Sequence, residues 1–213
     1  MTGSIMAQHF DWKFGSRYYY NVVATAPQVY PVSLHTSALQ LSDKRFEEVT
    51  YSSSSKWGFI NLTATGKKKH LPVMLDLQYD AYREQRFYSD TIPFHGKKLD
   101  SIFKTFLKTD NSYSFSEDER RVQGLNFVIG IANHGNIIIW IQGKDKQVEL
   151  LRHHIKWTPE MNVMHYPLDK IERQAFFDDM FKELSPATKL KIKADTDTKA
   201  NYIDTPSLYR PER

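Results

Sequence analysis

Two apolar runs joined by a short turn decide the fold of this sequence. They read Phe127-Val128-Ile129-Gly130-Ile131-Ala132, then the turn Asn133-His134-Gly135-Asn136, then Ile137-Ile138-Ile139-Trp140-Ile141. Apolar runs on either side of an Asn/Gly turn predict a β-hairpin. Both arms are apolar almost throughout, so we expect both faces of the hairpin to be covered and the pair to lie centrally in the fold.

Further strands are expected on both sides of this hairpin. Residues 146–155 follow a turn at 143–145 and can pair next to it. Earlier in the chain, aromatic and β-branched residues lie between Pro, Gly and Ser clusters, a pattern that predicts strands. The expected strands are residues 18–25, 29–35, 49–53, 57–63 and 71–79.

Two segments have helical spacing. The first carries one apolar face formed by Leu99, Ile102, Phe103, Phe106 and Leu107. The second spans residues 169–184, with Asp169 and Glu172 spaced as a capping box and Pro186 after its end. One helix should cover the sheet while the other packs at an end.

The predicted fold class is therefore α+β, mainly antiparallel β-sheet and sandwich-like, with about two packed helices. We expect one β-rich domain over residues 1–184. The composition becomes polar from residue 185, so residues 185–213 are expected to form a C-terminal tail that is partly packed or mobile.

Composition narrows the possible functions. The 213 residues include no cysteine, which excludes disulfides, thiolate nucleophiles and Cys-type zinc sites. The net charge is +4, but 25 acidic residues are interspersed with the basic ones, so nucleic acid is not an expected partner. No apolar run is long enough to span a membrane, and the first ten residues lack the pattern of a signal peptide.

The search for catalytic motifs is negative. The eight histidines form no H-E-x-x-H or H-x-H motif, and the sequence contains no nucleophile elbow, no S-x-x-K and no phosphate loop. The acids near Arg83 and Arg86, among them Glu84, are interpreted as members of solvated ion pairs. We therefore expect no enzymatic activity, no cofactor and no metal.

Aromatic and basic residues suggest where a partner could bind. The run Tyr18-Tyr19-Tyr20 follows Arg17 and must place rings on both faces of its strand, where tyrosine can either contact a partner or shield a sheet edge. Loops at residues 52–56 and 66–70 carry lysines, and the hairpin turn carries a histidine that should face solvent. The candidate partner-binding residues are Tyr18, Tyr20, Lys56, Lys67, Lys68, Lys69 and His134.

The order of several short motifs resembles a known family. These motifs are Phe10-Asp11-Trp12, Ala26-Pro27-Gln28-Val29-Tyr30-Pro31-Val32, Lys56-Trp57-Gly58, Gly66, Leu71-Pro72, Arg83-Glu84-Gln85-Arg86-Phe87-Tyr88 and Gly135-Asn136-Ile137-Ile138-Ile139-Trp140. The succession is similar to an uncharacterised family of Gram-negative envelope proteins known as a domain of unknown function. The resemblance covers residues 10–155.

This resemblance implies a function in the cell envelope. Members typically carry a lipoprotein leader with one lipidated cysteine, which this sequence lacks, and some are similar to immunity proteins that neutralise type VI secretion effectors such as phospholipases. It implies a periplasmic, outer-membrane-anchored protein in a full-length form, or a cytoplasmic one if this chain is the native product. The expected partner is a cognate effector, with membrane contact only through a lipid anchor absent from this chain. An envelope module that binds glycan or lipid is the alternative.

Overall fold

The computed structural model describes residues 16–27, 30, 32–51, 57–58, 60 and 62–165, together with 175, 178–179, 181–182, 185–187 and 190. The helices are α2 (Gly96–Lys108) and α3 (Pro159–His165). The strands are β1 (Arg17–Thr25), β2 (Val32–Leu34), β3 (Ala38–Leu41), β4 (Phe46–Glu48), β5 (Thr50–Tyr51), β6 (Lys69–His70), β7 (Pro72–Ala81), β8 (Arg86–Pro93), β9 (Tyr113–Glu117), β10 (Arg120–Ile131), β11 (Asn136–Gln142) and β12 (Gln147–His154).

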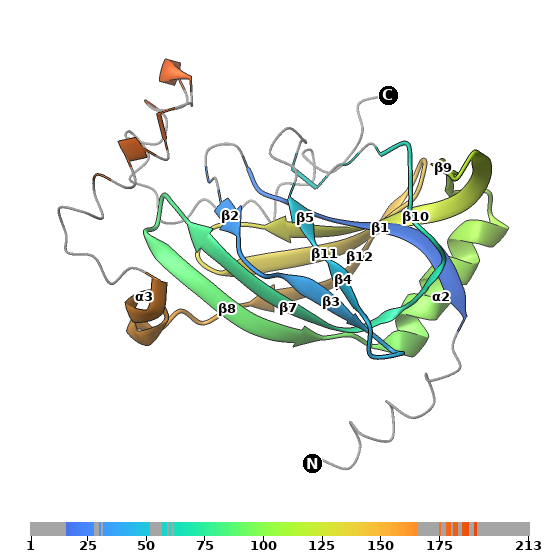
Figure 1. The fold of residues 1–213 in the computed structure, drawn as a ribbon, viewed down its shortest axis with the longest axis horizontal. Helices are drawn as coiled ribbons and strands as arrows, with labels where there is room; N and C mark the ends of the chain where they lie inside the picture. Colours follow the sequence, from blue (N-terminus) through green and yellow to red (C-terminus); the bar gives the residue numbers. More distant parts are fainter. Residues whose placement is uncertain are drawn as a thin grey trace, which may run out of the picture.

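The strands form two sheets that pack against each other (Figure 1). The larger sheet has the order β12-β11-β10-β1-β5, with β6 also paired to β1 and β9 to β10. The smaller sheet has the order β2-β7-β3-β4, with β8 paired to β7. One hydrophobic cluster takes side chains from both sheets, for example Leu77 and Tyr79 from β7 and Phe127 and Ile139 from the hairpin. The predicted α+β, β-rich sandwich-like class is confirmed.

The central hairpin lies where the sequence places it. Strands β10 and β11 pair in antiparallel register from Ile131↔Ile137 to Asn126↔Gln142, and β12 follows on the outer side of β11. Inward side chains such as Ile129 belong to the core between the sheets. Outward side chains such as Val128 and Trp140 belong to a second cluster with Trp57 and Ile60. The expectation that both faces of the hairpin are covered is therefore confirmed.

The neighbour of β10 on its other side is β1, and this pair runs parallel. Tyr19 lies opposite Gly124 and Thr25 opposite Gly130. Amide side chains bridge the strands at one level, because Asn21 Nδ2 donates to Asn126 Oδ1 at 3.4 Å and Asn126 Nδ2 donates to Gln142 Oε1 at 3.3 Å. A one-residue slip would separate these amides and turn every apolar side chain to the wrong face, so they help to specify the register.

The segment after residue 56 corrects a prediction. Residues 57–63 were expected to form a strand, but Trp57 and Gly58 form a turn and Ile60, Leu62 and Thr63 belong to no strand. The apolar residues pack by side chains on the outer face of the larger sheet, where Trp57 meets Trp140 edge to face at 5.5 Å. Gly130 makes room for this pair, since a Cβ atom there would lie 2.5 Å from the Trp140 ring. The apolar side chains of this segment are buried by packing on the sheet face, and the segment is not a strand of the sheet.

The two helices lie toward opposite ends of the sandwich (Figure 1). Helix α2 matches the predicted amphipathic segment and buries Leu99, Phe103 and Phe106 in the core. Helix α3 was not predicted, and its Asn162 side chain accepts a hydrogen bond from the backbone N–H of Phe87 at 2.9 Å. The helix expected over residues 169–184 and the tail over 185–213 lie almost wholly outside the described residues.

Candidate functional site

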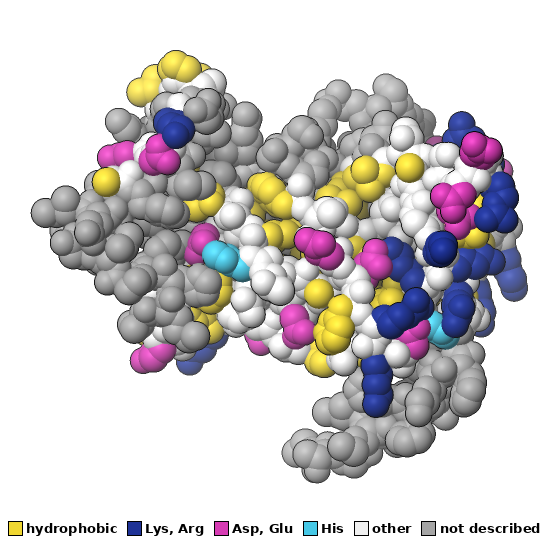
Figure 2. Space-filling view, in the orientation of Figure 1, with side chains coloured by type: hydrophobic (Ala, Val, Ile, Leu, Met, Phe, Trp, Pro, Cys, Tyr) yellow, Lys and Arg dark blue, Asp and Glu magenta, His cyan; other side chains and the backbone are white. Residues whose placement is uncertain are grey.

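Positive charge gathers at one end of the molecule. Figure 2 shows Lys and Arg side chains concentrated on the right, where Figure 1 places α2 and the start of β1. The central part of this surface, here called the basic end, is formed by the start of β1, the β3–β4 turn and the approach to β6. Its cationic residues are Arg17, Lys44, Arg45, Lys67, Lys68 and Lys69.

The β3–β4 turn positions Arg45. The turn is closed by a hydrogen bond from the Leu41 N–H to the Arg45 carbonyl at 2.8 Å, and Lys44 takes a positive φ of 69°. Asp43 accepts from the Arg45 backbone N–H through Oδ1 at 3.3 Å and from Arg45 Nε through Oδ2 at 2.7 Å. An aspartate that accepts from the N–H two residues later is a common turn-forming arrangement. One carboxylate therefore shapes the turn and orients the guanidinium.

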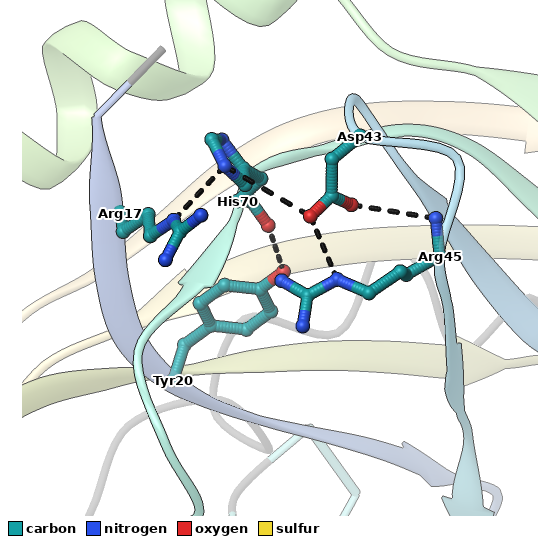
Figure 3. Close-up of polar contacts among 5 residues, drawn as sticks. All are labelled: Arg17, Tyr20, Asp43, Arg45 and His70. Carbon is teal, nitrogen blue, oxygen red and sulfur yellow. Dashed lines mark hydrogen bonds and ion pairs between the residues drawn. The ribbon is translucent and has the colours of Figure 1, made fainter. Parts of the chain in front are cut away.

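Strand pairing positions Arg17. Strand β6 lies antiparallel to the start of β1, with Arg17 opposite His70 and Tyr18 opposite Lys69. Arg17 Nε donates to His70 Nε2 at 3.0 Å (Figure 3). A guanidinium can only donate, so His70 Nε2 is the acceptor in this contact, and the same nitrogen lies 3.9 Å from Asp43 Oδ2. Within the described residues, the buried Nδ1 has no hydrogen-bond partner.

Tyr20 and Lys69 form the buried floor of the site. The Tyr20 side chain is fully buried, and its hydroxyl donates to the His70 carbonyl at 2.6 Å. Burial raises the pKa of Tyr20 well above its usual value, and the charges of Glu47 and Asp43 add to this effect. Lys69 pairs with Glu47, and its Nζ lies 4.8 Å from the centre of the Tyr20 ring. The Lys69 charge is therefore already neutralised inside the protein.

Asp43 is held in its charged form. Burial by itself would raise the pKa of Asp43, but the hydrogen bonds from the Arg45 side chain and backbone, together with the positive charge of Arg45, outweigh it. The net effect lowers the pKa of Asp43 below its ordinary value. At neutral pH this end of the protein thus combines a stable carboxylate with several cations.

The predicted partner-binding residues have different positions. Lys67 and Lys68 are exposed on the basic end, whereas Tyr18, Tyr20 and Lys69 are buried and cannot offer a surface to a partner. Tyr19 is the more exposed ring of the tyrosine run, with Lys68 Nζ 5.4 Å from its centre. Lys56 lies outside the described residues.

His134 lies away from the basic end, and its neighbour Glu84 corrects another prediction. The Glu84 side chain is only 8% exposed and is not a solvated partner of Arg83 or Arg86. It accepts from the Tyr88 hydroxyl and from the His134 backbone N–H, both at 2.6 Å. His134 therefore belongs to a contact between the β7–β8 turn and the hairpin turn.

Sequence reasoning missed Asp43 and Arg45. The sequence does contain a pattern that predicts this turn. The alternating residues Leu39-Gln40-Leu41 are typical of a strand, and the polar run Ser42-Asp43-Lys44-Arg45 that follows is typical of a turn before the next strand, β4. Arg17 and His70 were noted only as neighbours of the tyrosine run and the lysine loop. Nothing local indicates that the two meet, because their contact depends on the β1–β6 pairing.

The arrangement is suited to binding anions. A guanidinium presents several N–H donors in a plane that matches a carboxylate or phosphate group. Within the described residues, no group of three or more His, Asp or Glu side chains is arranged to hold a metal ion. No helix in that part of the chain has the length and apolar character needed to cross a membrane.

Comparison with known proteins places the chain in a family. No curated protein and no solved structure matches it. The profile of a family described as "Protein of unknown function (DUF2931)" matches residues 6–205, nearly the whole chain. The chain therefore belongs to the DUF2931 family, a family of proteins of unknown function.

Proposed function

We propose that this protein is a binding protein that docks its basic end on an acidic surface of another protein. The observation that carries the proposal is the exposure of Arg17, at the start of β1, and of Lys67 and Lys68, in the loop that leads into the paired strand β6. Clustered like charges of this kind steer an oppositely charged partner and favour a defined orientation. Lys69 supports the site from below and does not compete for the partner, since it is paired with Glu47.

The partner that we propose is an antibacterial effector, which this protein neutralises as an immunity protein. The motif order described above, with its similarity to immunity proteins of type VI secretion effectors, motivates this choice. A phospholipase effector would be inhibited if docking covered its active site or its membrane-binding face. The encounter would take place in the periplasm, with the immunity protein held near the membrane.

A second candidate is a module that binds an envelope glycan or an anionic lipid surface. Two aromatic residues, one partly exposed and one well exposed, favour it. Tyr19 lies beside Lys68, and Phe46 is 61% exposed directly after Arg45. Aromatic rings next to cationic side chains are common where proteins contact sugars or membrane surfaces. This candidate predicts binding to anionic vesicles or to glycan without any protein partner.

The test is to co-express the protein with the effector encoded beside its gene and to measure survival and co-purification. We expect protection in the compartment where the effector acts, and a complex that weakens as salt is raised. A Lys67→Gln, Lys68→Gln double variant should weaken the complex, whereas the matched variant Arg152→Gln, Lys156→Gln removes the same charge from exposed positions elsewhere. Equal killing with and without the protein, and no complex, would contradict the immunity function.

A further inference from the structure

We infer that Arg17 and Arg45 form a binding site for one carboxylate group, which an Asp or Glu side chain of the protein partner would occupy. This inference rests on the proposed function and makes it more specific. Figure 3 shows the two arginines on opposite sides of His70 and Tyr20, with their guanidinium groups pointing toward each other. His70 and Asp43 link the two arginines through contacts of 3.0, 3.9 and 2.7 Å, so a carboxylate bound over these two residues could accept hydrogen bonds from both guanidinium groups.

Both guanidinium groups are held in place from inside the protein. Arg17 Nε is bonded to His70 Nε2 at 3.0 Å, and Arg45 Nε is bonded to Asp43 Oδ2 at 2.7 Å. Each internal contact uses only the Nε–H, and the described residues provide no hydrogen-bond acceptor for the terminal nitrogens of either arginine. The terminal N–H groups therefore remain available, while the side chains are already oriented. Such preorganisation lowers the entropy lost on binding.

Charge favours a carboxylate over a phosphate. Asp43 is paired with Arg45 and Glu47 with Lys69, so Arg17 and the exposed Lys44, Lys67 and Lys68 leave this end of the protein with an excess of positive charge. Asp43, whose lowered pKa keeps it ionised, repels any anion that binds beside Arg45. A carboxylate carries one charge and is repelled less than a phosphate dianion.

One exposed apolar side chain follows Arg45 directly in the chain. This residue, Phe46, is one of the two large hydrophobic side chains that are well exposed in the described part of the molecule. Aromatic and arginine side chains placed together are typical of the residues that contribute most to protein interfaces. The geometry thus points to a partner segment in which an acidic residue is flanked by apolar ones.

The experiment uses peptides as probes and nuclear magnetic resonance as the readout. The probes are an acetylated Leu-Glu-Leu peptide, the same peptide with Gln in place of Glu, and inorganic phosphate. The resonances to follow are the side-chain Nε–H signals of Arg17 and Arg45. We expect the Glu peptide to shift both signals in a saturable way, and the Gln peptide and phosphate to have much weaker effects.

Variants distinguish a built site from general attraction. Arg45→Gln, at an exposed turn, should weaken binding of the Glu peptide at least about tenfold. Arg121→Gln, which removes an exposed arginine elsewhere, should leave binding unchanged. The inference is wrong if Glu and Gln peptides bind alike, if phosphate binds more tightly, or if all exposed arginines respond equally.

The carboxylate site and the proposed function can fail separately. If the Glu peptide binds at Arg17 and Arg45 but no effector is neutralised, the carboxylate site is confirmed and the immunity function is wrong. If the Arg45→Gln variant neutralises the effector as well as the unaltered protein does, the immunity function is confirmed and the carboxylate site is wrong.

Discussion

Two polar clusters at different ends of the sandwich contain similar residues but use them differently. Around Glu84, both carboxylate oxygens accept hydrogen bonds, from the Tyr88 hydroxyl and the His134 N–H, so the cluster is closed. At the basic end, Arg17 and Arg45 are exposed, and each uses only its Nε–H for a contact within the described residues. Buried charge with all its partners inside the protein serves stability, whereas preoriented donors without an internal acceptor are available to a ligand, the role proposed above for the basic end.

The largest expected effect is the loss of the closed cluster. Replacing Glu84 by Ala should lower the free energy of unfolding by about 3 kcal/mol, because two buried donors lose a charged acceptor. Urea denaturation followed by circular dichroism would measure the change. The control is Glu149→Ala, which removes an exposed carboxylate paired with Arg152 and should cost about 0.5 kcal/mol or less. Similar losses in both variants would mean that Glu84 does not join the two turns.

A middle-sized effect is expected for Tyr18, whose hydroxyl donates to Asp100 Oδ1 at 2.7 Å. Tyr18→Phe should cost about 1 kcal/mol at neutral pH, and Tyr19→Phe, with its long 3.4 Å contact to Glu117, should cost less. Burial, followed by the hydrogen bond to Asp100, raises the pKa of Tyr18 to about 12.

This pKa sets the pH dependence of the Tyr18 contribution. Because the folded pKa lies above the unfolded value of about 10, the stabilisation is complete below about pH 10 and is lost as pH rises toward the folded pKa. The difference in unfolding free energy between the natural protein and Tyr18→Phe should therefore shrink above about pH 10. A difference that grows with alkaline pH would contradict this assignment.

The smallest effect on stability is expected for Asp43. Its pKa is lowered in the folded state, so its contribution is present above the unfolded pKa of about 4 and is lost as pH falls through the folded value. Asp43→Asn should remove less than about 1 kcal/mol at neutral pH, because the Arg45 side chain is 58% exposed. Unfolding free energies measured from neutral to acidic pH would test this.

The Asp43→Asn variant also tests whether the basic end differs from the Glu84 cluster. In the Asn variant Arg45 loses its charged anchor, so binding of the Glu peptide should change more than stability does. The opposite result, a large loss of stability with unchanged binding, would show that the basic end is a second closed cluster.

Local patterns predicted the parts of the fold that depend on local spacing. The apolar hairpin and the amphipathic segment of α2 have periodicities that a single element explains. The 57–63 segment failed because alternating apolar residues serve equally well in a strand or in a segment that packs on a sheet face. Only the rest of the fold decides between these two uses.

The candidate site was predictable only in part. Lys67 and Lys68 are recognisable as a charged loop, but Arg17, Asp43 and His70 come from three separate stretches of the chain. Their contact depends on β6 pairing with β1 and on the β3–β4 turn reaching the same place. The burial of Tyr20 and Lys69 likewise follows from which face of each strand turns toward the core.

The parallel pairing of β1 and β10 has a consequence for how the chain acquires its fold. Asn21 and Asn126 are 105 residues apart, yet they meet in the middle of the larger sheet. During synthesis, β1 therefore cannot form its hydrogen bonds with β10 until β10 has emerged from the ribosome. Long-range pairing of this kind slows folding and leaves apolar strands exposed meanwhile. The tyrosine-rich strand at the start is thus the part of the nascent protein that most needs protection from aggregation.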